Sequence, residues 1–249
     1  MKYMGSKNRI AKFILPFLLE DYTYGMTFID ACVGGANVID KIPAHIPRYA
    51  NDNNKYLIAM FKSLQNGVDL DSYAGDISKD VYDVARDYYN NGLSDEHFTE
   101  DVIGWIGFMA SANGRFFEGG YSGISETKIG TKRNYIDESV RGIKKQIPFL
   151  KDIIFSCQNV TDINPVSKSI IYADIPYKGT KQYSKQKFNY DSFYDWCRKM
   201  SADGHIVYVS EYEMPSDFKC VWKQEVKSSL SANGKSGGLK MSIEKLFKL

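Results

Sequence analysis

This 249-residue sequence has few side chains that bind metals or take part in redox chemistry. Its four cysteines, at positions 32, 157, 197 and 220, form no short-spaced pair, and its three histidines are scattered. Zinc and thiol-redox motifs need such residues at short, regular spacings. The sequence therefore predicts a reduced protein without a metal site.

The sequence also lacks a long apolar run and an excess of one charge. No apolar stretch reaches the length of about 18 residues that a membrane-spanning helix needs. The first residues are not followed by the apolar core of a signal peptide. We therefore expect a soluble, cytoplasmic protein with no membrane partner. Its 32 basic and 30 acidic residues nearly balance, so a polyanionic partner would have to meet a local basic patch.

What the sequence does contain is an alternation of predicted strands and helices. Strands are expected at 27–30, 48–52, 153–155, 170–173 and 205–210, and helices at 8–21, 56–64 and 190–200. Two further segments, 221–229 and 242–249, flank a glycine-rich loop and predict a hairpin with one strand able to join the sheet antiparallel. The pattern is typical of an α/β protein with a doubly wound sheet.

The middle of the chain differs in charge from the rest. Residues 66–101 contain ten acidic and two basic side chains, whereas residues 111–145 contain four acidic and seven basic ones. The first part is typical of solvated helices. The second predicts an extended loop followed by a basic helix at 135–146, which suits contacts with phosphates, with aromatics that pack or stack. A surface loop with a solvated basic helix explains the composition equally well.

Two acidic residues at strand ends indicate a nucleoside site. Asp30 precedes a turn of small residues, Gly34-Gly35-Ala36, which allows a ligand to approach the backbone closely. Asp52 ends the next predicted strand, at the spacing typical of an acid that accepts hydrogen bonds from ribose hydroxyls. The turn does not match the dinucleotide pattern G-x-G-x-x-G, so a nucleoside cofactor without a pyrophosphate fits better.

The most informative motif is Asp174-Ile175-Pro176-Tyr177, at the end of the apolar run 169–173. It brings a carboxylate, a main-chain carbonyl and an aromatic ring to the carboxyl end of a strand, where open α/β sheets bind their ligands. Such groups suit an amine that must become nucleophilic. An ordinary strand-to-loop corner is the alternative, since proline stops strands and aspartate begins turns.

Four segments, in this order, resemble Dam-type (class alpha) adenine-specific DNA methyltransferases, in particular phage or prophage members. They are the stretches 2–7, 28–35, 51–54 and 174–177. The resemblance covers essentially the whole chain. It implies a Rossmann-like, seven-stranded sheet that binds S-adenosylmethionine, built from residues 1–65 and 150–249. A mostly helical target-recognition insertion would occupy residues 66–149.

The resemblance also assigns roles to individual residues. It implies a catalytic tetrad formed by Asp174, Ile175, Pro176 and Tyr177, and a cofactor site formed by Tyr3, Met4, Gly5, Lys7, Asp30, Gly34, Asp52, Asn159 and Val160. The basic residues Arg115, Lys128, Lys132 and Arg133 are candidates for contacts with phosphates or bases. The expected partner is double-stranded DNA with an adenine-containing site, in a bacterial host cell, and the oligomeric state stays open.

The implied reaction is direct methyl transfer from S-adenosylmethionine to the exocyclic amine of adenine. Because that amine is inaccessible in a stacked duplex, the base must flip out, with Tyr177 stacking on it. Restriction–modification, protection of phage DNA and regulation of expression all suit such an enzyme.

Three residues depart from the pattern of the family. Ile175 replaces the first proline of the tetrad, Cys32 stands where phenylalanine is usual, and Ala36 stands where glycine is frequent. The catalytic acceptor at position 175 is a backbone carbonyl, and the following proline still favours an extended backbone there. An inactive or weakly active DNA-binding homologue, and a methyltransferase acting on RNA or a protein amide, therefore remain alternatives. The aspartate at position 174 disfavours the protein amide, since glutamine-modifying relatives usually have asparagine there.

Overall fold

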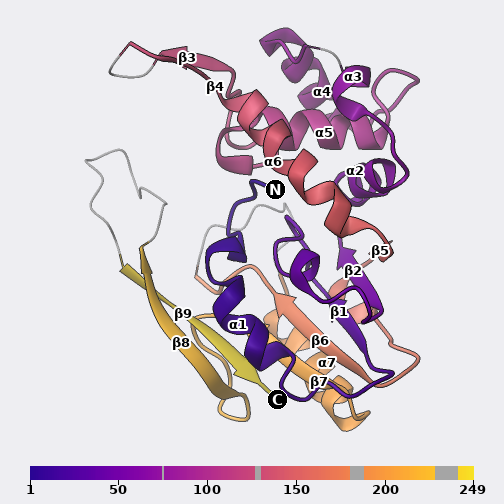
Figure 1. Cartoon of the computed structure of the whole chain (residues 1–249), viewed down its shortest axis with the longest axis vertical. Helices are drawn as coiled ribbons and strands as arrows, with labels where there is room; N and C mark the ends of the chain where they lie inside the picture. The colour runs from indigo at the N-terminus through magenta and orange to yellow at the C-terminus, as the bar shows by residue number, and fades with distance from the viewer. Residues whose placement is uncertain (75, 127–129, 180–187, 228–240) are drawn as a thin grey trace.

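The computed structural model describes residues 1–74, 76–126, 130–179, 188–227 and 241–249, and its centre is a seven-stranded sheet (Figure 1). Its strands are β1 (Thr27–Asp30), β2 (Arg48–Asp52), β5 (Ile153–Cys157), β6 (Ser169–Asp174), β7 (Ile206–Ser210), β8 (Lys219–Lys227) and β9 (Met241–Lys248). The spatial order is β5-β2-β1-β6-β7-β9-β8. The first five of these are parallel to their neighbours, and β9 joins β7 and β8 antiparallel.

The helices cover the sheet and form a second region beside it. They are α1 (Ala11–Leu18), α2 (Lys55–Gln65), α3 (Leu70–Ala74), α4 (Lys79–Asn91), α5 (Glu100–Ala110), α6 (Tyr135–Leu150) and α7 (Tyr190–Ala202), with the 3-10 turns η1 (Lys7–Arg9), η2 (Ile39–Lys41), η3 (Ala112–Gly114) and η4 (Val160–Asp162). The described helices include none that is long and apolar enough to cross a membrane.

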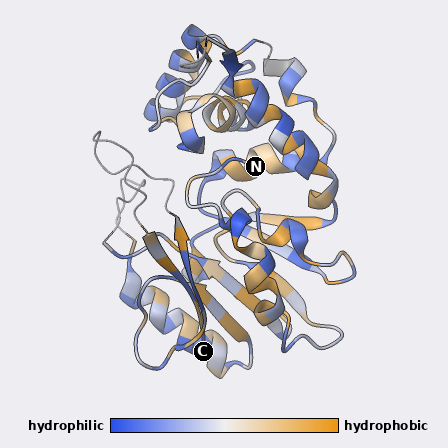
Figure 2. Cartoon of the chain, turned by 60° about the vertical axis from the view of Figure 1, so that its left-hand side comes forward, coloured by the Kyte–Doolittle hydropathy of each residue, from blue (hydrophilic) through white to orange (hydrophobic). Residues whose placement is uncertain are grey.

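Each face of the sheet has its own core because successive residues of a strand point to opposite sides. Phe28 of β1 belongs to the core that also contains Ile14 and Leu18 of α1. The next residue, Ile29, belongs to the other core, with Phe193 of α7. Both faces are therefore covered, as parallel sheets require. Figure 2 shows hydrophobic residues in the strands of the sheet and in the helices around it. This architecture confirms the predicted α/β class and the seven-stranded sheet.

We call residues 70–150 the helical region; it comprises α3 to α6 and the hairpin β3 (Ile124–Glu126) and β4 (Lys132–Asn134), and lies above the sheet in Figure 1. Helix α5 is its centre, with every residue from Val102 to Ala110 buried. Gly104 lets α5 approach α2 very closely, since an added Cβ would lie 2.2 Å from the Tyr56 carbonyl oxygen. The hairpin, in contrast, is almost entirely exposed.

Most predicted elements are present, but three details of the prediction differ. The expected helix at 8–21 is η1 followed by the shorter α1, and neither α5 nor the exposed hairpin was predicted. The segment 111–121 was expected to be an extended loop. Instead it contains η3 and a bridge between Ser111 and Tyr121. Its phenylalanines pack internally: Phe116 and Phe117 lie 4.6 Å from Phe108 and 5.2 Å from Tyr82, respectively, between ring centroids.

The close approach of α5 to α2 gives a testable difference between two helical glycines. Gly104→Ala is expected to lower the free energy of unfolding by about 1–3 kcal/mol, because the methyl group would overlap backbone atoms of α2. Gly142→Ala is the matched control: on the exposed side of α6 an added Cβ meets no atom within 4 Å. It should raise the free energy of unfolding by about 0.5–1 kcal/mol through helix propensity. Urea unfolding of both variants measures these changes. Equal responses would contradict the close contact.

Candidate active site

Three aspartates lie close together at the carboxyl ends of neighbouring parallel strands. Asp52, Asp30 and Asp174 are the last residues of β2, β1 and β6, with β1 between the other two. Asp30 is 2% exposed, and burial together with the charges of Asp174 and Asp52 raises its pKa well above the usual range. The topology thus brings together three of the residues that the sequence predicted for one site.

Asp174 is paired with Lys7 from the N-terminal segment. The Lys7 Nζ atom lies 2.7 Å from Asp174 Oδ1 and donates a hydrogen bond to the Gly5 carbonyl at 3.1 Å. The Lys7 side chain is only 8% exposed, so this is a largely desolvated pair. Burial raises the pKa of Asp174, and the Lys7 ammonium opposes that shift. Lys7, predicted to bind the cofactor, therefore contacts the predicted catalytic carboxylate.

Tyr177 is fixed on several sides. Its hydroxyl donates to Glu244 Oε2 of β9 at 2.7 Å, and Tyr212 packs edge-on against its ring with centroids 4.5 Å apart. The Lys7 Nζ atom lies 4.7 Å from the ring centroid, in cation–π geometry. Glu211, 1% exposed, accepts hydrogen bonds from the backbone of Lys178 at 2.9 Å and of Tyr212. The ring is thus held in place next to Asp174.

The two residues between Asp174 and Tyr177 are placed differently. Ile175 is 2% exposed and packs in the core with Ile29 and Ala31. Pro176 is exposed, and its carbonyl accepts a hydrogen bond from the Tyr190 hydroxyl at 2.8 Å. The isoleucine that replaces the usual proline is therefore a core residue that anchors the tetrad.

The turn after β1 is hydrogen-bonded to Asp52. Asp52 Oδ2 accepts a hydrogen bond from the Gly34 backbone, and Oδ1 accepts one from the Asn54 backbone, both at 3.0 Å. Asn54 in turn caps α2 by accepting from Tyr56 and Leu57. Burial raises the pKa of Asp52. Each carboxylate oxygen can accept a second hydrogen bond, so Asp52 can hold this turn and still bind a ribose hydroxyl.

Tyr3 packs over the same turn. A Cβ added at Gly34, where φ is +45°, would lie 2.8 Å from the Tyr3 ring, and one at Gly35 would lie 2.6 Å from Tyr3 Cβ. The Tyr3 ring also stacks on Phe108 of α5, with centroids 5.7 Å apart. Met4 is partly buried, and Gly5 is exposed with φ at +76°. The N-terminal segment thus lies between the turn and the helical region.

The end of β5 provides the remaining predicted cofactor residues. Val160 is 5% exposed in η4, whereas Asn159 is exposed and caps that turn by accepting from the Thr161 backbone at 3.4 Å. Asn51 of β2 donates to the carbonyls of Ala31 and Gln158, at 3.1 and 3.0 Å. This buried amide ties the segment after β5 to the end of β1.

The described residues fit a nucleoside cofactor that carries a positive charge. Asp30 Oδ1 is buried and has no hydrogen-bond partner among the residues that the structure describes. A buried carboxylate oxygen needs a donor. S-adenosylmethionine offers an ammonium group and ribose hydroxyls as donors. Asp30 and Asp52 therefore suit this cofactor.

The structure describes three of the four predicted DNA-contacting residues, on two different segments. Lys132 and Arg133 lie on the exposed strand β4. Arg133 forms a bidentate pair with Glu138, at 2.5 and 2.8 Å, and lies over the Tyr135 ring at 4.6 Å. Arg115 is partly buried next to η3, and Lys128 lies outside the described residues.

Sequence reasoning missed Glu244, Asn51 and Gln146 among the residues that shape the site. Glu244 is far from Tyr177 in the chain and reaches it only through the antiparallel strand β9. Asn51 precedes Asp52 at the end of β2, so its position beside the predicted ribose acid was the available signal. Gln146 lies in a helix whose sequence indicated only a basic surface.

Comparison with known proteins identifies the family of the chain. The model of one family, described as D12 class N6 adenine-specific DNA methyltransferase, matches residues 3–204, and this range contains all the predicted site residues. No curated protein matches the chain. The matched range covers most of the sequence, and these enzymes use S-adenosylmethionine as methyl donor. The chain belongs to the D12 class of N6 adenine-specific DNA methyltransferases.

Proposed function

We propose that this methyltransferase acts on an adenine flipped out of double-stranded DNA at a specific site, with the segment 174–177 as its catalytic tetrad. One observation carries this assignment. The Lys7 ammonium is bound by both the Asp174 carboxylate, at 2.7 Å, and the face of the Tyr177 ring, at 4.7 Å from the centroid. The same two groups suit an adenine, which presents an N–H donor next to an aromatic ring.

In the proposed reaction, the protein must make the weakly nucleophilic amine of adenine reactive. S-adenosylmethionine supplies a methyl group on a sulfonium, and the exocyclic amine of adenine has its lone pair delocalised into the ring. Hydrogen bonds from that amine to Asp174 and to the Ile175 carbonyl favour the tetrahedral nitrogen, as preorganised acceptors do for developing positive charge. The buried Ile175 side chain keeps this carbonyl in place. Positioning next to the methyl donor supplies much of the remaining rate.

The helical region is the proposed target-recognition part, corresponding to residues 66–149, with 1–65 and 150–249 as the catalytic part. The exposed hairpin supports this, since it presents Lys132 and Arg133 at the surface. Arg133 is held by Glu138 and Tyr135, which orders a guanidinium suited to phosphates or to guanine edges. Flipping follows because the amine of a stacked base cannot reach Asp174 at the end of β6.

The experiment that tests this function offers the purified protein several methyl acceptors. Unmethylated DNA, RNA and a glutamine-containing protein extract are each incubated with radiolabelled S-adenosylmethionine. We expect label only in the N6-methyldeoxyadenosine of DNA, confined to one short sequence when the sites are mapped. Label in RNA or protein would overturn the DNA substrate. Binding of DNA and cofactor without any transfer would identify an inactive binding homologue.

The Lys7–Asp174 pair predicts a specific pH response. Asp174 must be ionised to accept the amine hydrogen, so activity falls as the pH decreases through its pKa. Lys7 lowers the pKa of Asp174, and Lys7→Met therefore raises that pKa further. The acid limb of kcat/KM is expected to move to higher pH in Lys7→Met.

Initial rates of DNA methylation over a pH series measure this limb. Lys12→Met, on the exposed side of α1, is the control and should leave the limb where it is in the wild type. An acid limb that stays fixed in Lys7→Met would contradict the proposed ionisation of Asp174.

A further inference from the structure

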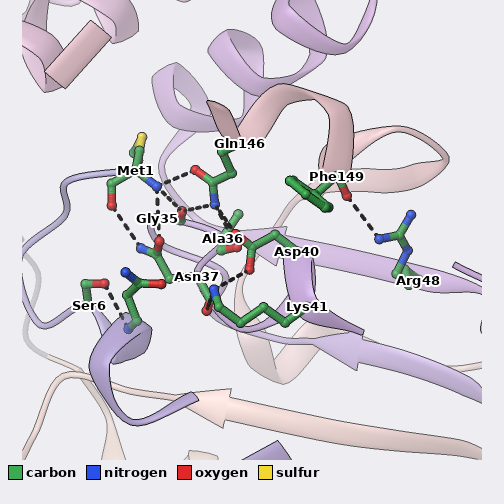
Figure 3. Close-up of polar contacts among 11 residues, drawn as sticks. Met1, Ser6, Gly35, Ala36, Asn37, Asp40, Lys41, Arg48, Gln146 and Phe149 are labelled. Atoms are coloured by element: carbon green, nitrogen blue, oxygen red, sulfur yellow. Dashed lines mark hydrogen bonds and ion pairs between the residues drawn. The ribbon is translucent and has the colours of Figure 1, made fainter. Parts of the chain in front are cut away.

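A single buried glutamine joins the helical region to the predicted cofactor turn. Gln146 of α6 is 6% exposed, and its Nε2 atom lies 3.1 Å from the Gly35 carbonyl oxygen and 3.0 Å from that of Ala36. The same atom lies 2.9 Å from Asp40 Oδ2. Its Oε1 atom accepts a hydrogen bond from the Met1 amino group. Figure 3 shows the amide pointing into the turn between these partners.

The turn needs such support because of Ala36. Its φ is +54°, in the left-handed region where a side chain is disfavoured and glycine is usual. Ala36 is completely buried, so its carbonyl has no access to water and needs a protein donor. Gln146 supplies the shorter of two hydrogen bonds to this carbonyl, at 3.0 Å, and the Asp40 backbone N–H supplies the other, at 3.3 Å. A non-glycine residue stays in this conformation only where the surroundings hold it there.

Other contacts also hold the turn, and two of them are longer hydrogen bonds to the same carbonyls. The Met1 amino group donates to the Gly35 carbonyl and the Asp40 backbone N–H to the Ala36 carbonyl, both at 3.3 Å. Asp52 binds the Gly34 backbone on the opposite side, and Tyr3 packs on the glycines. Asn37 binds the Met1 carbonyl and amino group, at 3.0 and 3.1 Å. The shortest hydrogen bonds to the Gly35 and Ala36 carbonyls come from Gln146 of α6, at 3.1 and 3.0 Å. The conformation of this turn therefore depends on a side chain that comes from outside the sheet.

We propose that Gln146 is a positioning residue for cofactor binding, which holds the turn 34–37 in its binding conformation by pairing two carbonyls and stabilising the left-handed Ala36. This rests on the proposed function only in taking that turn as the cofactor site. Gln146 itself is not a catalytic residue, since it acts through the backbone of the turn.

The test uses Gln146→Met, which fills the same space but removes the amide donors. Calorimetric titration with S-adenosylhomocysteine is expected to give a Kd about tenfold higher than the wild type, as expected when buried carbonyls lose a hydrogen-bond partner. In steady-state methylation, KM for S-adenosylmethionine should rise by a similar factor, while kcat at saturating cofactor stays within about twofold. A general loss of folded protein would instead lower kcat with KM unchanged.

Gln65→Met is the matched control. The Gln65 amide also donates to two backbone carbonyls, those of Leu150 and Ile153, both at 2.8 Å, but away from the turn. It should lower the melting temperature without raising the Kd. A Kd for Gln146→Met within about twofold of the wild type would overturn the proposal, as would an equal rise in both variants. If the wild type fails to bind S-adenosylhomocysteine, the cofactor site itself is wrong.

A second substitution tests the role of Ala36 and remains informative if Gln146→Met is poorly folded. Glycine adopts the left-handed conformation without the steric cost of a side chain. Adding Ala36→Gly to Gln146→Met is therefore expected to recover part of the lost affinity, so that the two changes are not additive. Strict additivity of the two effects on the Kd would overturn the proposal that Gln146 acts by holding Ala36.

Discussion

Asp174→Asn is expected to lower kcat for DNA methylation by about a thousandfold, while cofactor and DNA binding persist. Asparagine has nearly the same shape, but it lacks the negative charge and presents an amide donor in place of one acceptor oxygen. The developing positive charge on the adenine amine then has no counter-charge at the strand end. The amide also loses the ion pair with Lys7, 2.7 Å away in the wild type.

Single-turnover methylation of a DNA duplex measures this loss, because it separates the chemical step from product release. Asp217→Asn is the control; this aspartate is paired with Arg198 at the surface, at 2.7 Å, and should retain wild-type kcat. A rate for Asp174→Asn within about tenfold of the wild type would remove Asp174 from its proposed catalytic role.

Asp52→Ala is expected to weaken the binding of S-adenosylhomocysteine by about a hundredfold. Two effects combine. The ribose loses its charged acceptor, and the backbone N–H groups of Gly34 and Asn54 lose the carboxylate that they share at 3.0 Å. Since the Gly34 N–H belongs to the cofactor turn, the site is expected to become both less polar and less ordered.

Calorimetric titration with S-adenosylhomocysteine measures the affinity of this variant. Asp71→Ala is the comparison, since Asp71 forms a surface pair with Lys144 at 2.6 Å and lies in the helical region. It should bind as the wild type does. Affinities of Asp52→Ala and the wild type that agree within about threefold would contradict the ribose assignment.

The sequence predicted the centre of the sheet well because β1, β6 and β7 are short apolar runs with polar ends. The predicted bounds of β1 and β2 agree with the observed ones. Helix α5 was not predicted because it is buried on all sides. Its sequence therefore lacks the amphipathic period that marks a surface helix. The hairpin was not predicted for the opposite reason: β3 and β4 are polar and exposed, so their sequences resemble that of a loop.

The site was predictable only where its residues stand in local motifs. Asp30, Asp52 and Asp174 end their strands, and the topology of parallel neighbours brings them together. The contact of Tyr177 with Glu244 depends on the register of β9, which no local pattern specifies. The sequence showed that Ala36 replaces the glycine that is frequent in the family, but it did not show how the alanine is accommodated. Only the structure relates this residue's φ of +54° to the glutamine of α6.

Helix α2 makes the sheet and the helical region mechanically continuous. On one side of α2, Phe61 stacks on Phe155 of β5, with ring centroids 5.2 Å apart. On another side, Gly104 of α5 packs directly against the backbone of α2, with no side chain between the two helices. So close a contact leaves no room for the two regions to slide past each other, because packed interiors resist small displacements. Stiffness is therefore concentrated around α2. Under the proposed function, adjustment to the shape of the DNA falls to the protruding hairpin β3–β4 (Figure 1).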